Sequence, residues 1–145
     1  MAPVAAARDS LLVLVVDDEA SVRGFAERAL RGAGYEVVVA SDGPEALRLV
    51  EAQCRPFDLF MVDVVMSEMR GDELARRLRQ RDPGVKVLYF TGYSDRLFEN
   101  RQMLWEQEAF LEKPVAINGL LEAVSLLLFG HTKGPAAAEV PERTG

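Results

Sequence analysis

Short apolar runs alternate along the chain with longer segments in which apolar residues recur every three or four positions. The first run, LLVLVV at 11–16, is rich in Val and Leu, which is typical of a strand buried on both faces of a parallel sheet. The next segment, 20–33, has the spacing of an amphipathic helix, and Gly34 follows it as a helix terminator. Because parallel strands need helical crossovers, this alternation predicts a doubly wound α/β fold.

The same pattern continues to residue 129 and predicts five strands and five helices. Strands are expected at 11–16, 36–40, 58–63, 85–90 and 109–111, and helices at 20–33, 44–53, 71–81, 95–106 and 117–129. The apolar residues of 95–106 are scattered, so an irregular or mobile helix is expected there.

A single domain is expected over residues 11–129. The chain has 145 residues, of which 49% are hydrophobic, and this is enough to bury a sizeable core. Residues 1–10 are interpreted as a flexible N-terminus. Residues 130–145 are rich in Gly, Pro and Ala without an apolar period, and they are interpreted as a flexible tail or the stub of a linker.

Composition excludes several classes of function. The formal charge of −6 argues against nucleic-acid binding. A single cysteine, Cys54, rules out an internal disulfide and fits a reducing compartment. No apolar run is as long as a membrane span, and the N-terminus lacks the features of a secretory signal. A cytoplasmic protein with no membrane partner is therefore expected, and its oligomeric state is left open.

Acidic residues stand where two of the predicted strands end. Asp17 and Asp18 follow the first strand, and Asp63 ends the third within the apolar stretch FMVDVVM. If these strands are neighbours, the acids repel by about 4 kcal/mol at a separation near 4 Å and an effective dielectric near 20, which a cation would relieve. Oxygen ligands with water favour Mg²⁺. The alternative for Asp17 and Asp18 is helix capping.

Two further residues at the same edge favour phosphoryl chemistry. Thr91 follows the fourth strand with a short hydroxyl, and Lys113 follows the fifth with a fixed positive charge. Taken alone, Thr91 could be simply a strand-favouring residue, and Lys113 could be an ordinary surface lysine. Together with three acids they match phosphoryl transfer, which needs charge neutralisation and positioning, and Asp63 would be the nucleophile.

Four motifs, VLVVDDE, DLFMVDVVMSEMRGDEL, VLYFTGYSD and AFLEKPV, resemble in order and spacing the receiver domain of two-component response regulators, over about residues 11–129. The resemblance implies a flavodoxin-like, five-stranded parallel sheet of order 2-1-3-4-5 with five helices. It implies a histidine kinase or histidine phosphotransfer domain as phosphodonor. It also implies a downstream protein partner that reads the surface formed by residues 95–129.

The resemblance also assigns roles to individual residues. Asp63 would be the phosphoacceptor, and Mg²⁺ would be held by Asp18, Asp63 and the carbonyl of Val65, with Asp17 assisting through water. Thr91 and Lys113 would bind the phosphoryl oxygens after transfer. Phe110 would turn inward in the active state, and the peptide between Lys113 and Pro114 would be cis.

Two residues depart from the usual pattern of receiver domains. Ser67 stands where many receivers have Pro, and Val65 has no polar side chain to orient an attacking water, so a long-lived phosphoryl group is expected.

A receiver-like module that binds a partner without phosphorylation is the main alternative. An aspartate-based phosphatase lacks the required acid spacing, and a dinucleotide-binding domain would need a glycine-rich motif where this chain has acids. The chain is interpreted as a stand-alone regulator or an excised domain of a hybrid kinase.

Overall fold

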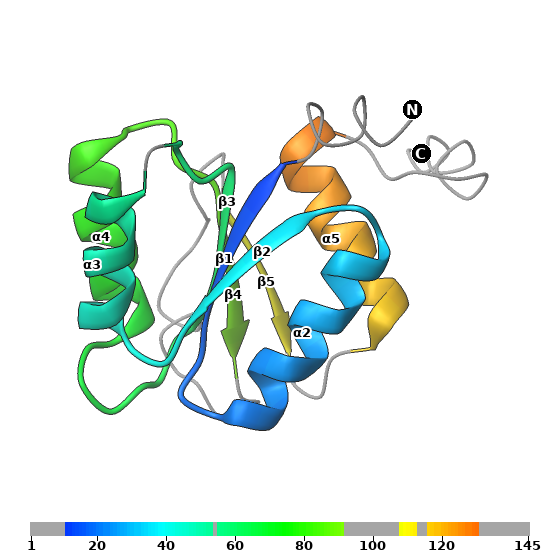
Figure 1. Ribbon diagram of the computed structural model, residues 1–145, viewed down its shortest axis with the longest axis horizontal. Coiled ribbons are helices and arrows are strands. Elements are labelled where there is room, and N and C mark those ends of the chain that lie inside the picture. Colours follow the sequence, from blue (N-terminus) through cyan, green and yellow to red (C-terminus); the bar gives the residue numbers. More distant parts are fainter. Residues whose placement is uncertain (1–10, 54, 92–107, 113–115, 131–145) are drawn as a thin grey trace, which may run out of the picture.

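The computed structural model describes residues 11–53, 55–91, 108–112 and 116–130. In this part of the chain, parallel strands alternate with helices (Figure 1). The strands are β1 (Leu12–Val16), β2 (Glu36–Ala40), β3 (Leu59–Asp63), β4 (Val87–Thr91) and β5 (Glu108–Glu112). The helices are α2 (Ala20–Gly32), α3 (Gly43–Ala52), α4 (Gly71–Arg81) and α5 (Ile117–Phe129).

The strands form one parallel sheet in the order β2-β1-β3-β4-β5. Strand β1 pairs on one side with β2, where Val16 lies opposite Ala40, and on the other side with β3, where Val16 lies opposite Val62. The carboxyl ends of β1 and β3 are therefore neighbours, as the sequence interpretation of the acids required. The order is also the flavodoxin-like order that the resemblance implied.

Helices cover both faces of the sheet, α3 and α4 on one and α2 with α5 on the other (Figure 1). Alternate residues of β1 divide between two cores: Leu14 packs in the core with α3 and α4, and Val15 packs in the core with α2 and α5. This division follows from the alternation of side chains along a strand. A sheet buried on both faces explains the uninterrupted apolar run at 11–16.

Local signals in the sequence account for the helix ends. Asp42 caps α3, because its carboxylate accepts a hydrogen bond from the Glu45 N–H at 2.8 Å, and Pro44 lies in the first turn. Gly34 follows α2 with a φ of 100°, which a residue without a Cβ adopts readily.

Four of the five described strands differ from the predicted bounds: β1 and β3 each begin one residue later, and β4 and β5 differ at both ends. Strand β4 begins at Val87 rather than at residue 85, because the Val85 N–H donates to the carbonyl of Asp82 in the preceding turn. Strand β5 covers 108–112 rather than 109–111. The helix expected at 95–106, the flexible N-terminus expected at 1–10, and all but the first residue of the tail expected at 130–145 lie outside the described residues. Among the described helices, none has the length and apolar character needed to cross a lipid bilayer.

Candidate functional site

Three carboxylates meet at the carboxyl ends of β1 and β3. Asp17, Asp18 and Asp63 each place a carboxylate oxygen within 4.8 Å of the others. Asp17 is fully buried, Asp63 is 5% exposed, and Asp18 is exposed to solvent. The structure therefore brings together the three acids that the sequence analysis selected.

Backbone hydrogen bonds between the strand ends position these acids. The Asp17 N–H donates to the Ala40 carbonyl at 3.2 Å, and this bond extends the pairing of β1 with β2 by one residue. Asp63 lies opposite Phe90 in the register of β3 and β4. The Val64 N–H then donates to the Phe90 carbonyl at 3.0 Å, so the chain stays attached to β4 beyond Asp63.

Side-chain capping of α2 does not account for the three acids. Asp17 Oδ1 accepts a hydrogen bond from the Glu19 N–H at 2.9 Å, just before α2 begins. Glu19 occupies the N-cap position and makes no side-chain capping bond. Since Asp63 belongs to another strand, the capping alternative leaves its place beside Asp17 and Asp18 unexplained.

The donor set of the cluster fits a hard divalent cation. Every side-chain donor is a carboxylate oxygen, and two of the three acids are buried. Negative charges this close repel one another, and a bound cation offsets the repulsion because it attracts each carboxylate. Few carboxylates, with one side of the cluster open to water, match the coordination of Mg²⁺ better than the many-ligand coordination of Ca²⁺.

Arg23 is a residue of this site that the sequence analysis missed. Its Nη1 donates to the main-chain carbonyl of Asp17 at 2.6 Å, and its side chain is half-buried. Arg23 lies in the first turn of α2, where the helix dipole disfavours a positive charge. A basic residue at such a position is a signal of a nearby negative group, and it could have been read from the sequence.

The structure describes some of the remaining predicted site residues and leaves others outside the described part of the chain. Val65 is 57% exposed, and its N–H donates to Asp63 Oδ1 over a long 3.4 Å. Thr91 is the last residue of β4, and its backbone lies opposite that of Glu112, directly before Lys113. Phe110 lies in β5 opposite Tyr89. Lys113, Pro114 and the peptide between them lie outside the described residues.

Comparison with known proteins identifies one family. The family model for the response regulator receiver domain matches residues 13–125. Sensor kinase CckA of Brucella abortus is 37% identical over 119 residues, which are 82% of this chain and 13% of that protein. Response regulator receiver protein CpdR of the same organism is 31% identical over 116 residues, 80% of this chain and 95% of that protein.

A solved structure gives the same result. The response regulator TrrA of Thermotoga maritima, determined in complex with Mg²⁺ and BeF, superposes with a TM-score of 0.71 at 30% identity. The match covers 81% of this chain and 99% of that one. The present chain thus spans nearly all of CpdR and about an eighth of the sensor kinase CckA. The other activities of that kinase are not assigned to this chain.

Proposed function

The chain belongs to the response regulator receiver domain family, and we propose that it accepts a phosphoryl group on Asp63. The observation that carries the proposal is the convergence of Asp17, Asp18 and Asp63, from two adjacent strands, within 4.8 Å. Asp63 is the acid that lies in the centre of the sheet, between the ends of β1 and β4. Its Oδ1 accepts a long hydrogen bond of 3.4 Å from the Val65 N–H, at the carboxyl end of β3.

Magnesium is the proposed cofactor. Asp18, Asp63 and the main-chain carbonyl of Val65 would hold the ion, and buried Asp17 would assist through water. When bound, Mg²⁺ supplies positive charge that neutralises the phosphoryl oxygens and orients them. Arg23 holds the carbonyl of Asp17 at 2.6 Å and so fixes the end of β1 from which two of the acids project.

The proposed donor is a phosphohistidine of a histidine kinase or a phosphotransfer domain. A carboxylate oxygen of Asp63 attacks phosphorus in line with the imidazole nitrogen. The new O–P bond forms as the N–P bond breaks, and the electron pair of that bond returns to the nitrogen, which takes up a proton. The product is an acyl phosphate on Asp63, and the chain acts as a phosphoacceptor rather than as an enzyme on other substrates.

The switch that follows phosphorylation is also a proposal. Thr91 ends β4 opposite Glu112 of β5, and Lys113 follows Glu112 in the sequence. Both would bind the phosphoryl oxygens, with the Lys113–Pro114 peptide cis. Phe110 would turn inward, and the surface of residues 95–129 would then change for a downstream protein. A partner responds to such a change only through its different affinity for the two forms.

We propose residues 11–129 as the folding unit that carries this function, with 1–10 and 130–145 as flexible flanks. The packing supports the proposal, since the described residues of both cores fall within that range. A stand-alone regulator and a domain of a larger kinase remain two forms in which this unit would work.

The test is phosphorylation by a small phosphodonor with Mg²⁺, followed by intact-protein mass spectrometry. We expect the mass of one phosphoryl group to be added to the unaltered protein and none to Asp63→Asn. Asp42→Asn is the matched control, because Asp42 lies near the same edge of the sheet and asparagine caps α3 equally well. Absence of Mg²⁺-dependent labelling, or equal labelling of Asp63→Asn, contradicts the proposal and favours a module that acts without phosphorylation.

A further inference from the structure

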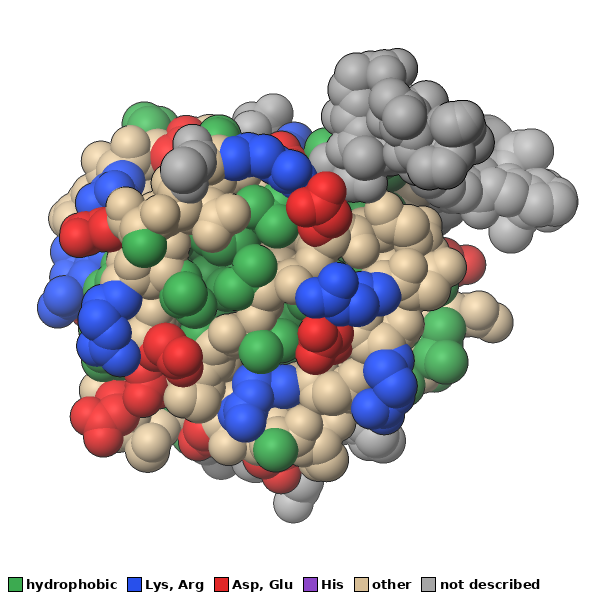
Figure 2. All heavy atoms as spheres, viewed as in Figure 1, with side chains coloured by type: hydrophobic (Ala, Val, Ile, Leu, Met, Phe, Trp, Pro, Cys, Tyr) green, Lys and Arg blue, Asp and Glu red, His purple; other side chains and the backbone are tan. Residues whose placement is uncertain are grey.

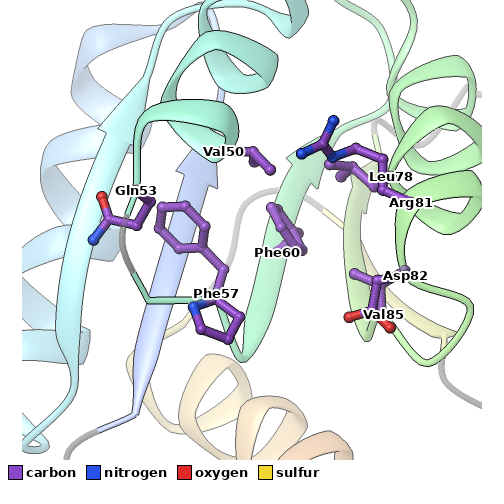
Figure 3. A pocket seen from close by; sticks show the side chains of 9 residues that line it. Val50, Gln53, Phe57, Phe60, Leu78, Arg81, Asp82 and Val85 are labelled. Carbon is purple, nitrogen blue, oxygen red and sulfur yellow. The ribbon is translucent and has the colours of Figure 1, made fainter.

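A cavity of about 310 Å³ opens between the C-terminal ends of α3 and α4 (Figure 3). Its residues come from these two helices, from the chain that leads into β3, and from the turn before β4. It therefore lies beside the amino ends of the strands, whereas Asp63 lies at their carboxyl ends. The cavity is separate from the acidic cluster, and no step of the proposed phosphoryl chemistry uses it.

The inner wall of the cavity is aromatic. The rings of Phe57 and Phe60 lie 5.5 Å apart between centroids and are tilted by 53°, and both residues are largely buried. Val50 of α3 and Leu78 of α4 face each other across the space above them (Figure 3). These side chains give the cavity an apolar lining that is aromatic on one wall and aliphatic on its sides, and the volume suits one small ring system.

One cation stands at the mouth of this apolar space. Arg81 extends from α4 toward α3 (Figure 3). Its Nη1 lies 3.4 Å from Oε2 of Glu51. Both side chains are well exposed, at 49% and 67%, and an ion pair of this kind contributes little to stability. A carboxylate from a ligand can therefore replace Glu51 on the guanidinium at small cost.

Asp82, the acid that lines the cavity, is engaged in a hydrogen bond of its own turn. Asp82 Oδ1 accepts a hydrogen bond from the Gly84 N–H at 3.0 Å in the turn before β4. Figure 3 shows its carboxylate on the side opposite to the guanidinium of Arg81. In the wider view, hydrophobic side chains gather on the face beside α3, and charged side chains surround them (Figure 2). Arg81 is thus the positive charge at the α3 side of the cavity, and Asp82 lies on the other side.

We propose that this cavity binds a small aromatic carboxylate. The ring would lie against Phe57 and Phe60 between Val50 and Leu78, and the carboxylate would pair with Arg81 at the mouth. A guanidinium binds a carboxylate through paired hydrogen bonds and also stacks on aromatic faces, so a single residue recognises both parts of such a ligand. A neutral ring lacks the charged contact, and an aromatic amine would meet a like charge.

The binding test is a titration of the isotope-labelled full chain with naphthoate, followed by NMR. We expect saturable shifts of backbone amide signals confined to residues 50–60 and 78–85. Naphthylmethanol and naphthylmethylamine are the matched probes, which keep the ring and replace the carboxylate. Each should bind about tenfold more weakly or worse, as expected for loss of a charge-assisted hydrogen bond.

Two matched variants locate the charged contact. Arg81→Gln should weaken naphthoate binding about tenfold. Arg77→Gln should leave it unchanged, because Arg77 lies on the same helix with the same 49% exposure but pairs with Glu73. Val50→Phe should block binding by filling the cavity. The proposal is overturned by absence of saturable shifts, by shifts elsewhere, by equal binding of the amine, or by equal effects of the two arginine variants.

Discussion

The backbone of Gly71, at the first position of α4, lies directly against the main-chain carbonyl of Asp63. A Cβ on residue 71 would overlap that carbonyl oxygen and would come within 2.8 Å of Cγ1 of Val62. The Gly71 N–H also donates to the Val64 carbonyl at 2.8 Å. The helix therefore begins in contact with the strand end that carries the proposed phosphoacceptor, and only glycine permits this approach.

Gly71→Ala should consequently destabilise the protein by about 1–3 kcal/mol, because the added methyl group must displace backbone or a buried valine. We also expect slower phosphorylation, since the displaced backbone is that of Asp63. Urea unfolding measures the first effect, and phosphodonor labelling measures the second.

Gly119→Ala is the matched control for this substitution. Gly119 lies in α5, and a Cβ there would meet nothing within 4 Å. Alanine should raise the free energy of unfolding at that position by roughly 0.5–1 kcal/mol, because it restricts the unfolded chain and favours helix. If the two variants changed the free energy of unfolding equally, the close contact of Gly71 with Asp63 would not affect stability.

The contrast between Gly71 and Asp63 shows which features could be predicted from the sequence. Asp63 was identified because an acid at the end of an apolar run violates the local pattern, and parallel strands bring such ends together. Gly71 gave no such signal, since its contact depends on how closely α4 packs on β3. The cavity beside Phe57 and Phe60 was missed for a similar reason, because the separation of α3 and α4 is a property of packing.

Helix and strand positions were predicted well where local chemistry decides them. The cap at Asp42 and the positive φ of Gly34 have recognisable residue types. The start of β4 was wrong by two residues, because Val85 continues the apolar pattern while its N–H belongs to the turn at Asp82. Burial of Asp17 beside an exposed Asp18 was also beyond the sequence, since it depends on the bond from Asp17 to Ala40 that extends the sheet.

The ion pairs of Glu73 predict a pH dependence of stability. Hydrogen bonds from Arg76 at 2.6 Å and Arg77 at 2.8 Å hold the pKa of Glu73 at about 2, below its ordinary value of 4.5. A lowered folded-state pKa stabilises the folded protein above pH 4.5, and this contribution is lost as the pH falls toward about 2. Glu73→Gln should therefore lose less stability over that interval than the unaltered protein.

The measurement is the free energy of unfolding by urea at several pH values below 4.5. The side chains are accessible to solvent, so the difference should be small and should shrink at high salt. A difference of the opposite sign, or one that salt does not reduce, would show that these ion pairs are not its source.

Asp18 provides a test of the repulsion within the acidic cluster. In the presence of a chelator, Asp18→Asn should stabilise the protein by about 1 kcal/mol, because it removes one of three neighbouring charges at an exposed position. With saturating Mg²⁺ the unaltered protein should be the more stable of the two, since it gains the free energy of metal binding and the variant gains less. Thermal unfolding with and without Mg²⁺ measures both effects.

Glu122→Gln on α5 removes a charge of the same sign from an exposed position outside the cluster. It should leave the response to Mg²⁺ unchanged. If Asp18→Asn responded to Mg²⁺ as strongly as the unaltered protein, the assignment of Asp18 as a ligand would be wrong, whatever the role of Asp63.

Val65 leads to a prediction about the lifetime of the phosphoryl group. Its side chain is 57% exposed, two residues after Asp63, and carries no atom that could orient water toward phosphorus. Val65→Asn introduces an amide at that position and should speed hydrolysis about tenfold or more, by positioning the attacking water. Release of inorganic phosphate from the phosphorylated protein, after removal of the donor, measures the rate.

Val65→Ala is the control, because it shortens the side chain without adding a polar group. If exclusion of water by the valine were the cause of a long lifetime, alanine would speed hydrolysis as much as asparagine does. We expect instead that alanine has a small effect, because the side chain already lies in solvent and leaves the site open to water. A rate unchanged by asparagine would refute the explanation from water positioning, and it would assign control of the lifetime to other residues around Asp63.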